Sequence, residues 1–521
     1  MGRIPVPAPG DAYNAGDWLL RAVASRASER VIRCGTDSLS GSELAARGLA
    51  FQAELARLGV GRGERVLIVA RDGPSFVAAF LGALRGGAVP VPISTLLPAK
   101  DVAFIARDAD VRVALLDRGL GESLLDPGLY PRGARLIAAD PFEIEGVTPG
   151  AEPAAAATRA DDPAFFLYTS GTTGEPKGVV HRHVDLPVTA ELYAREVLGM
   201  GPSDRVLSAA KLFFAYGLGN SLTFPLALGS EVVLCPERAT PDAMFGLIAR
   251  EEPTLFFGVP TLYASLLAHP GAPESLGRVR LCVSAGEALP APLWERWRTR
   301  FGVEILDGLG STEMLHIFLS NRPGSCRPGS SGVPVPGYDV RIVDADGNDV
   351  PDGETGTLLA RGASAACRYH GRPEESARTM FAPGWLRTGD SYRRDADGFH
   401  WSEGRTDDLM KVGGIYVSPL EVEALLAAHP AVLEAAVVGE PDEHGLTKPR
   451  AFVVLGPGAR PSDALARELQ DHVKAKTAPH KYPRRVDFVA ELPKTATGKI
   501  RRHVLRDDAW VGCPRIPEKP T

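Results

Sequence analysis

The chain has few cysteines, and none of them stands in a spacing that binds metal. Six cysteines occur among 521 residues, far apart and without a Cys-x-x-Cys pair. Zinc sites and disulfide frameworks need closely spaced or densely paired cysteines, so the sequence favours reduced thiols. A zinc-stabilised domain and a disulfide-rich secreted fold are therefore not expected.

Long apolar runs and an excess of basic residues are missing as well. No uninterrupted apolar stretch approaches the roughly 18 residues that cross a membrane. Residues 1–20 lack the basic start and apolar core of a signal peptide. The formal net charge is −6, whereas a nucleic-acid binder carries a basic patch. We expect a cytoplasmic protein that binds neither membranes nor nucleic acids.

What is present is an ordinary globular composition, 44% hydrophobic and 23% charged, in a chain too long for one core. Short apolar runs alternate with helical periodicity in its first part. Strands are predicted at 65–70, 88–93 and 111–116, and helices at 75–85 and 101–110. This alternation predicts an α/β fold in which helices cover both faces of a largely parallel sheet.

One stretch, Tyr168–Gly178, combines three glycines, four Ser or Thr hydroxyls and a lysine directly after a predicted buried strand at 164–167. Glycines allow the backbone N–H groups to face inward, hydroxyls add donors, and Lys177 adds a mobile positive charge. These features suit a polyphosphate, although the spacing is not that of the Walker P-loop. A Ser/Thr/Gly-rich surface loop is the alternative.

Two later turns carry carboxylates. The stretch Asp307–Met314 follows a predicted strand at 303–306, and its Glu313 is placed to hold Mg²⁺ through one oxygen; a helix cap is the alternative. Asp390 ends a tight turn and suits the two hydroxyls of a ribose, but an ordinary turn aspartate fits as well. The aromatic stretch at 211–220 is either core or the wall of a flat apolar pocket.

The last part of the chain changes character. Residues 404–414 mix charges with glycines, as a linker between domains does. A capping box at Ser418–Glu421 predicts a helix reaching His429. Strands at 432–438 and 450–455 and a helix at 462–476 complete a small α+β unit. Lys499, in a glycine-containing loop near the end, is either a solvated charge or a cation delivered to a phosphoryl group.

Taken together and in order, six stretches resemble those of the adenylate-forming superfamily, which includes acyl- and aryl-CoA ligases, peptide-synthetase adenylation domains and beetle luciferases. They are 168–178, 211–220, 284–288, 307–313, 385–390 with 404–414, and 493–499. The resemblance implies a large N-terminal domain with helix-covered mixed and parallel sheets, 1–406, and a small mobile α+β C-terminal domain, 407–521. It also implies activation of a carboxylate by ATP, with Mg²⁺ as cofactor and coenzyme A as co-substrate.

The resemblance also assigns residue roles. The phosphate loop binds the β- and γ-phosphates, Thr312 contacts the α-phosphate, Glu313 ligates Mg²⁺ and Lys499 enters the site during adenylation. Asp407 is the hinge, and the Gly413–Gly414 region replaces Lys499 during thioester formation. The nucleotide-binding set is Thr169, Ser170, Gly171, Thr172, Thr173, Gly174, Lys177, Ala285, Gly286, Glu287, Asp307, Gly308, Asp390, Arg405, Gly413 and Gly414.

Within the superfamily, the chain is most similar to the benzoate- and hydroxybenzoate-CoA ligases, through Phe214–Gly219 and Ser311–Phe318. That similarity implies an acid pocket with a flat apolar wall, in which His316 donates a hydrogen bond to the carboxylate. No extra cation for a second acid group is evident, which favours a monocarboxylic aromatic acid. The implied pocket residues are Phe214, Ala215, Tyr216, Gly217, Gly310, His316 and Ile317.

The main hypothesis is an aryl-CoA ligase that makes benzoyl-CoA, or a substituted benzoyl-CoA, through an acyl adenylate. A stand-alone adenylation enzyme that loads a carrier-protein thiol is the alternative among enzymes, and a non-catalytic nucleotide-binding protein is the alternative outside them. The resemblance further predicts a lysine acetyltransferase acting on Lys499 as a regulatory partner. It is compatible with a homodimer, but the sequence leaves the oligomeric state open.

Overall fold

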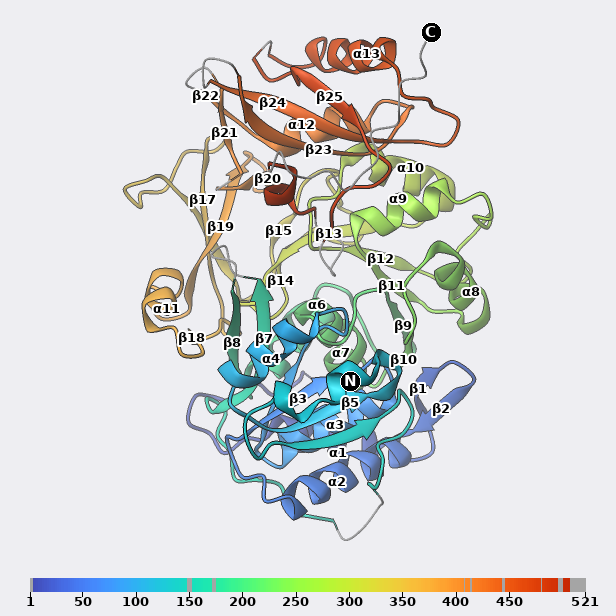
Figure 1. Cartoon of the computed structure of the whole chain (residues 1–521), viewed down its shortest axis with the longest axis vertical. Helices are drawn as coiled ribbons and strands as arrows, with labels where there is room; N and C mark the ends of the chain where they lie inside the picture. Colours follow the sequence, from blue (N-terminus) through green and yellow to red (C-terminus); the bar gives the residue numbers. More distant parts are fainter. Residues whose placement is uncertain are drawn as a thin grey trace.

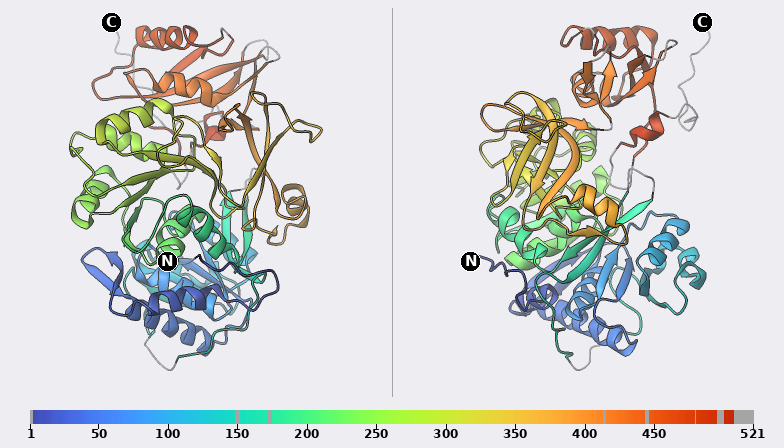
Figure 2. Two further views of the ribbon diagram at one scale, coloured as in Figure 1. Left: turned by 180° about the vertical axis from the view of Figure 1, so that it is seen from behind. Right: turned by 90° about the vertical axis from the view of Figure 1, so that its left-hand side faces the viewer.

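The structure is a computed structural model that describes residues 3–147, 152–170, 175–406, 408–412, 415–442, 446–478, 480–494 and 500–506. Figure 1 shows a large part, blue to light orange, with a smaller unit in darker orange and red at one end. Figure 2 shows from two further sides that this unit lies beyond the large part. Among the described residues, no helix is long and apolar enough to cross a membrane.

The first sheet has the strand order β4-β3-β5-β6, and all its neighbouring strands are parallel. Its predicted strand–helix alternation is confirmed, with boundaries shifted by one or two residues. The strands are β3 (Arg65–Val69), β4 (Val89–Pro92), β5 (Val111–Asp117) and β6 (Arg135–Ala139); the helices beside them are α1 (Ala15–Ala24), α2 (Gly41–Arg57), α3 (Pro74–Arg85) and α4 (Ala99–Asp108). Every residue of α3 is buried, which explains why it carries no polar stripe.

The second sheet is mixed, with the order β15-β14-β13-β12-β11-β9-β10-β1-β2. Its inner strands are parallel, whereas β2, β14 and β15 pair antiparallel at the two edges. The strands are β1 (Arg30–Cys34), β2 (Asp37–Ser40), β9 (Arg205–Ser208), β10 (Glu231–Leu234), β11 (Leu255–Gly258), β12 (Leu281–Ser284), β13 (Ile305–Gly310), β14 (Ile317–Ser320) and β15 (Val333–Pro334). Connecting helices include α8 (Pro241–Glu251), α9 (Pro260–Ala268) and α10 (Ala291–Phe301).

One strand boundary differs from the expectation. The strand predicted at 303–306 was expected to end before Asp307, but β13 continues to Gly310. Residues 308–310 pair with β14 in a hairpin, and that pairing extends the strand. Asp307 therefore lies inside a strand of the sheet instead of in the turn that follows it.

The phosphate stretch lies in a third sheet, β18-β8-β7. Strands β7 (Pro163–Ser170) and β8 (Pro176–Arg182) are antiparallel, and Thr169 pairs with Lys177. The short strand β18 (Arg368–Tyr369) pairs with β8. The buried strand expected at 164–167 is thus longer at both ends, and the described ends of the stretch belong to two antiparallel strands. Thr169 and Lys177 are strand residues.

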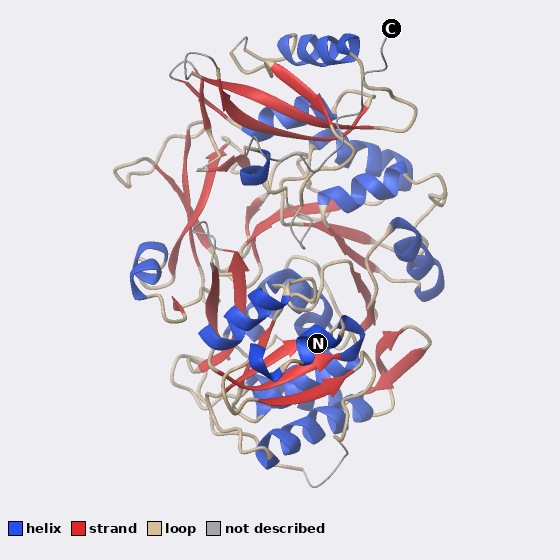
Figure 3. Cartoon of the chain, in the orientation of Figure 1, coloured by secondary structure: helices blue, strands red, loops and turns tan. Residues whose placement is uncertain are grey.

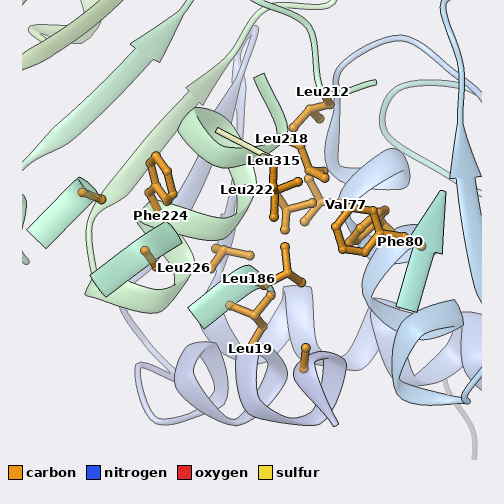
Figure 4. Close-up of a cluster of buried hydrophobic side chains, with 14 of the residues drawn as sticks. Leu19, Val77, Phe80, Leu186, Leu212, Leu218, Leu222, Phe224, Leu226 and Leu315 are labelled. Carbon is orange, nitrogen blue, oxygen red and sulfur yellow. The ribbon is translucent and has the colours of Figure 1, made fainter. Parts of the chain in front are cut away.

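Two helical stretches on either side of β9, residues 185–195 and 215–228, pack against α1 and α3. It comprises α5 (Asp185–Thr189), α6 (Ala215–Leu218), α7 (Phe224–Leu228) and the π-helical turns Ala190–Arg195 and Gly219–Thr223. Figure 4 shows Leu186, Leu218 and Leu222 of this segment against Leu19 of α1 and Phe80 of α3. Leu19, Phe80, Leu218 and Leu222 are fully buried and Leu186 nearly so.

The remaining part of the large domain is an antiparallel sheet, β16-β17-β19-β20. Its strands are β16 (Asp339–Val343), β17 (Thr355–Arg361), β19 (Trp385–Arg394) and β20 (His400–Arg405), with helix α11 (Pro373–Thr379) before β19. Asp390 and Arg405 are paired residues of β19 and β20. This sheet adjoins the start of the small unit.

The small unit has the α+β composition predicted from its sequence, as Figure 3 shows. Its elements are β21 (Met410–Val412), β22 (Ile415–Val417), α12 (Pro419–Ala427), β23 (Val432–Pro441), β24 (Thr447–Leu455), α13 (Asp463–Lys474), β25 (Arg485–Phe488) and α14 (Arg502–Leu505). It has apolar clusters of its own on both faces of the β23-β24-β25 sheet. Ser418 caps α12 as predicted, but the capping box is incomplete, because the Glu421 carboxylate accepts from Lys481 Nζ at 2.7 and 2.8 Å.

Candidate functional site

The site begins where neighbouring parallel strands end. Gly258 of β11 pairs with Ser284 of β12, and Ser284 pairs with Asp307 of β13. Residues 285–287 and 307–308 therefore lie side by side at one edge of the sheet. The carboxyl edge of parallel strands is the usual place for ligands in α/β folds. Gly286 has a φ of 98°, a conformation that favours glycine.

Asp307 is a buried carboxyl group. Its Oδ2 accepts from the Leu289 N–H at 3.3 Å, and its Oδ1 has no hydrogen-bond partner among the described residues. Burial raises the pKa of this carboxyl well above its ordinary value. Burial therefore favours the neutral form of this carboxyl group, which can donate a hydrogen bond.

The connection between β13 and β14 is a tight, pinned turn. Leu315 adopts a φ of 66°, which a leucine rarely does and which costs roughly 1–3 kcal/mol. The carbonyls of 312–314 each accept a hydrogen bond: the first from the Leu315 N–H at 3.1 Å, the second from the Ala366 N–H at 2.7 Å, and the third from the Ser364 hydroxyl at 2.8 Å.

Burial of Leu315 helps to hold that strained conformation. Its side chain is 3% exposed, and Figure 4 places it beside Leu218 and Leu222 in the core. The turn is thereby anchored on one side by apolar packing and on the other by its carbonyl partners. The side chains of Thr312 and Glu313 are both half-buried.

The Glu313 carboxylate shares its surroundings with the phosphate-stretch lysine. Its Oε1 accepts from the Tyr369 hydroxyl at 2.8 Å. The Lys177 ammonium lies 5.6 Å from the centre of the Tyr369 ring and forms an ion pair with Glu375 of α11. One tyrosine on β18 therefore contacts both the predicted metal ligand and the predicted phosphate-binding cation.

Glu313 fits a Mg²⁺ ion that is held mainly by substrate oxygens. Within the described ranges, no group of three or more His, Cys, Asp or Glu side chains stands ready to bind a metal. Mg²⁺ is usually bound by one or two carboxylates together with substrate phosphates and water. A single half-buried carboxylate is the protein ligand that such an ion needs.

Asp390 is held by the arginine predicted to assist it. Arg405 Nη1 donates to Asp390 Oδ1 at 3.1 Å and to the Thr388 carbonyl at 2.8 Å. Gly389, with a φ of 76°, permits the close approach, because a Cβ there would lie 2.6 Å from the guanidinium. This pair lies at the edge of the large domain, just before the predicted hinge.

A hydrogen bond connects the two domains at the site. The Ile500 N–H donates to Glu287 Oε1 at 2.8 Å. Ile500 directly follows Lys499 in the chain, and Glu287 lies next to the strand edge described above. In this domain orientation the tail is therefore tied to the predicted nucleotide site.

The predicted acid pocket contains a cluster of aromatic rings. Tyr216 is half-buried at the start of α6, and its hydroxyl donates to the Val283 carbonyl at 3.1 Å. The His316 ring centre lies 5.6 Å from that of Tyr216, 5.1 Å from Tyr193 and 4.6 Å from Phe224. Phe214 and Ala215 are also half-buried and precede Tyr216 in the chain.

His316 differs from the expectation that it donates to the acid's carboxylate. Its Nε2 lies 3.1 Å from Asn220 Oδ1, and burial lowers its pKa to about 3. A neutral imidazole has one hydrogen, and an amide oxygen requires it at Nε2. Nδ1, which has no partner in the described part of the chain, is then an acceptor. In this structure the ring is bonded to Asn220, and the role of His316 toward the acid's carboxylate stays a prediction.

Close packing in the fold explains the residue type at three other predicted pocket positions. Ile317 is 1% exposed, and its Cγ2 would lie 2.8 Å from a Cβ on Gly308. A Cβ on Gly217 would lie 2.0 Å from a backbone carbonyl, and one on Gly310 2.8 Å from another. The backbone packing alone accounts for both glycines, so their roles toward a substrate stay predictions.

Several predicted site residues lie outside the described residues. They are Gly171, Thr172, Thr173, Gly174, Asp407, Gly413, Gly414 and Lys499, and for Ser170 only the backbone is described. Sequence reasoning missed Tyr369, Glu375, Asn220 and His181, which contact predicted site residues in the structure. A tyrosine or histidine without a glycine-rich neighbourhood gives no local signal of such a contact.

Comparison with known protein families gives a result that agrees with the site described above. Residues 19–370 match the AMP-binding enzyme family, and residues 421–499 match the AMP-binding enzyme C-terminal domain. The chain belongs to the AMP-binding enzyme family. The adenylate-forming fold predicted from the sequence, with its large N-terminal and small C-terminal domains, is confirmed.

Individual members of the family resemble this chain along almost its whole length. It is 49% identical to a benzoate–CoA ligase of Thauera aromatica, over 95% of this chain and 96% of that protein. It superposes with a TM-score of 0.89, at 46% identity, on the crystal structure of a benzoate CoA ligase from Burkholderia xenovorans LB400, covering 95% of this chain and all of that one. A structure of the anthranilate CoA ligase AuaEII with anthranoyl-AMP gives a TM-score of 0.90 at 42% identity, covering 96% and 97%.

Proposed function

We propose that the protein is an AMP-forming aryl-CoA ligase that converts benzoate or a substituted benzoate, ATP and coenzyme A into the CoA thioester, AMP and pyrophosphate. One observation carries the proposal. His316, whose ring packs near that of Tyr216, directly follows in the chain the turn that bears Thr312 and Glu313. An aromatic acid seated against that cluster has its carboxylate close to the phosphate-binding residues. The relatives described above supply the acid and thiol classes.

The reaction runs in two steps. A carboxylate oxygen attacks the α-phosphorus of ATP, and the bond from that phosphorus to the pyrophosphate oxygen breaks. The sulfur of coenzyme A then attacks the carbonyl carbon of the acyl adenylate, and AMP leaves. Both steps gather negative charge in a cleft from which water must be excluded, because the acyl adenylate would otherwise hydrolyse.

Each residue of the site has a role in these steps that follows from its position. Lys177 supplies positive charge to the outer phosphates, and the Thr312 hydroxyl reaches the α-phosphate. Glu313 would hold Mg²⁺, which neutralises charge on the phosphates when bound. Asp390, steadied by Arg405, accepts from the ribose hydroxyls.

The domain arrangement fits the first step. We place the domain boundary at 406/407, with residues 1–406 and 407–521 as the two bodies and Asp407 as the hinge between them. The bond from Ile500 to Glu287 holds the tail next to the predicted nucleotide site, and Lys499 is the preceding residue. Rotation about the hinge would withdraw Lys499 and bring the Gly413–Gly414 region forward for thioester formation.

The decisive experiment follows both steps separately. With the purified protein, benzoate should drive pyrophosphate release without coenzyme A, and adding coenzyme A should give benzoyl-CoA. A panel of hydroxy-, amino- and halobenzoates together with aliphatic acids ranks the substrates. Transfer to a carrier protein but not to free coenzyme A would contradict the ligase assignment, and pyrophosphate exchange with none of the acids would contradict the enzyme assignment.

Regulation and location are further parts of the proposal. Acetylation of Lys499 would remove the charge that the first step requires, so an acetyltransferase with acetyl-CoA should inactivate the protein. Unchanged activity after complete acetylation would contradict this role. We also propose that the protein is cytoplasmic. A homodimer is the assembly to test, by light scattering.

A further inference from the structure

A buried histidine reaches the turn that carries Thr312. His181 lies in β8, the strand that follows the phosphate stretch, and its side chain is fully buried. Its Nε2 lies 2.8 Å from the Thr312 carbonyl oxygen, and its Nδ1 lies 3.0 Å from Asp185 Oδ2. The Phe165 ring stacks on the imidazole with centres 5.1 Å apart.

The partners of His181 determine where its hydrogens are. A backbone carbonyl only accepts, so Nε2 must carry a hydrogen. The Asp185 carboxyl group accepts from the Arg182 N–H at 2.9 Å and from Arg182 Nη2 at 2.8 Å. Its Oδ2 also lies against Nδ1 of the ring, so Asp185 holds the imidazole with Nε2–H directed at the Thr312 carbonyl.

The bond to Thr312 acts at the strained point of the turn. The Thr312 carbonyl already accepts from the N–H of Leu315, the residue with a φ of 66°. His181 adds a second donor to the same oxygen and so restrains that peptide group. The hydroxyl of Thr312 and the carboxylate of Glu313 are then presented on a backbone held by both donors.

We propose that His181, held by Asp185, is a positioning residue for adenylation: it fixes the Thr312 carbonyl, and thereby the groups that contact the α-phosphate and its metal ion. This inference rests on the proposed function, because those contacts belong to the adenylation step. His181 also connects the two parts of the phosphate site. Its strand, β8, contains Lys177, and its hydrogen bond reaches the turn that carries Thr312.

Two substitutions test the two hydrogen bonds of the imidazole one at a time. Glutamine places an N–H close to the Nε2 position, so His181→Gln retains a donor for the Thr312 carbonyl. Asparagine ends at the Nδ1 position, so His181→Asn keeps the contact with Asp185 and loses the one with Thr312. Both variants are polar and remove the ring from the same buried place, so their melting temperatures should fall by similar amounts.

His183 provides a matched control two residues away. It is 1% exposed, and its Nδ1 accepts from the Ala15 N–H of α1 at 3.1 Å. His183→Gln loses a buried hydrogen bond as well and should lower the melting temperature. It should leave the rate of adenylation per folded molecule unchanged.

The measurements are pyrophosphate exchange at saturating ATP and benzoate, thioester formation from synthetic benzoyl adenylate, and ATP affinity by calorimetry without any acid. His181→Asn should lose about 100-fold in the kcat of exchange, whereas His181→Gln loses less than about 10-fold. ATP binding should weaken about 10-fold in His181→Asn only. Thioester formation should change less than about 3-fold in both, a tolerance well below the loss of one hydrogen bond.

Equal losses in the Asn and Gln variants would overturn the inference, as would a loss of exchange in His183→Gln as large as in His181→Asn. Failure of the proposed function is recognised separately. In that case the wild-type protein shows no exchange with any acid, and the ATP affinities of the two variants still decide the role of His181.

Discussion

Removing the carboxylate of Glu287 should weaken adenylation and spare thioester formation. The Ile500 N–H donates to this carboxylate at 2.8 Å across the domain interface. A hydrogen bond to a charged group contributes about 1.5–3 kcal/mol, which corresponds to a factor of about 10–150. In the proposed mechanism, rotation of the small domain breaks this bond, so its loss should destabilise only the domain orientation in which Ile500 contacts Glu287.

The assay compares the kcat of benzoate-dependent pyrophosphate exchange at saturating ATP with the rate of thioester formation from synthetic benzoyl adenylate. Glu287→Ala should lose about 10-fold or more in the first and little in the second. Glu287→Gln keeps an oxygen acceptor and should lose only about 2- to 10-fold. Saturating ATP separates this effect from any contact of Glu287 with the adenine, which would raise KM.

The donor can be removed from the other side of the interface. Ile500→Pro deletes the N–H, and Ile500→Ala trims the side chain while keeping the N–H. The first should match Glu287→Ala, and the combination of the two should be no worse than either alone. Equal losses in both half-reactions, or an Ile500→Ala variant as impaired as Ile500→Pro, would refute the argument.

Three further outcomes are expected. Lys499→Ala should abolish adenylation and still convert synthetic benzoyl adenylate into thioester; normal pyrophosphate exchange would remove Lys499 from the mechanism. Tyr369→Phe deletes the donor to Glu313 and should raise the Mg²⁺ concentration for half-maximal exchange about 10-fold, which a Mg²⁺ titration checks; an unchanged titration would mean that the hydroxyl does not orient the carboxylate. Burial raises the pKa of Asp72 to about 6, although Lys211 opposes the rise. The folded state therefore holds the proton more tightly than the unfolded state does. As pH rises from about 4 to 6, the ionisation of Asp72 lowers the free energy of unfolding increasingly. Asp72→Asn should therefore gain about 2 kcal/mol more in the free energy of unfolding at pH 8 than at pH 4, measured by urea denaturation, and a pH-independent difference would contradict the burial argument.

The order of elements was readable from the sequence because it depends on local pattern. Helix α3 and its flanking strands were predicted within one or two residues, since glycines and prolines mark their ends. The small domain was predicted as α+β for the same reason. The boundary of β13 was missed, because residues 308–310 become a strand only through pairing with β14.

The chemistry of the site was readable where residue types alone imply it. Glycine, hydroxyl and lysine residues in one stretch indicate a phosphate site, and a carboxylate after a Gly/Ser/Thr turn indicates a metal ligand, in any fold that presents them. Contacts over long sequence separations have no such signal. Nothing near Tyr369 in the sequence indicates Glu313, and nothing near His181 indicates Thr312.

The sequence by itself determined the family, the class of reaction and the order in which the motifs occur, because each motif carries its chemistry in adjacent residues. Only the tertiary structure decided which hydrogen each buried group carries and which groups hold the motifs in place. Asn220 contacts the His316 ring, burial raises the pKa of Asp307, and the tail reaches Glu287. These properties depend on burial and on partners far away in the chain, and they arise only when the strands bring those partners together.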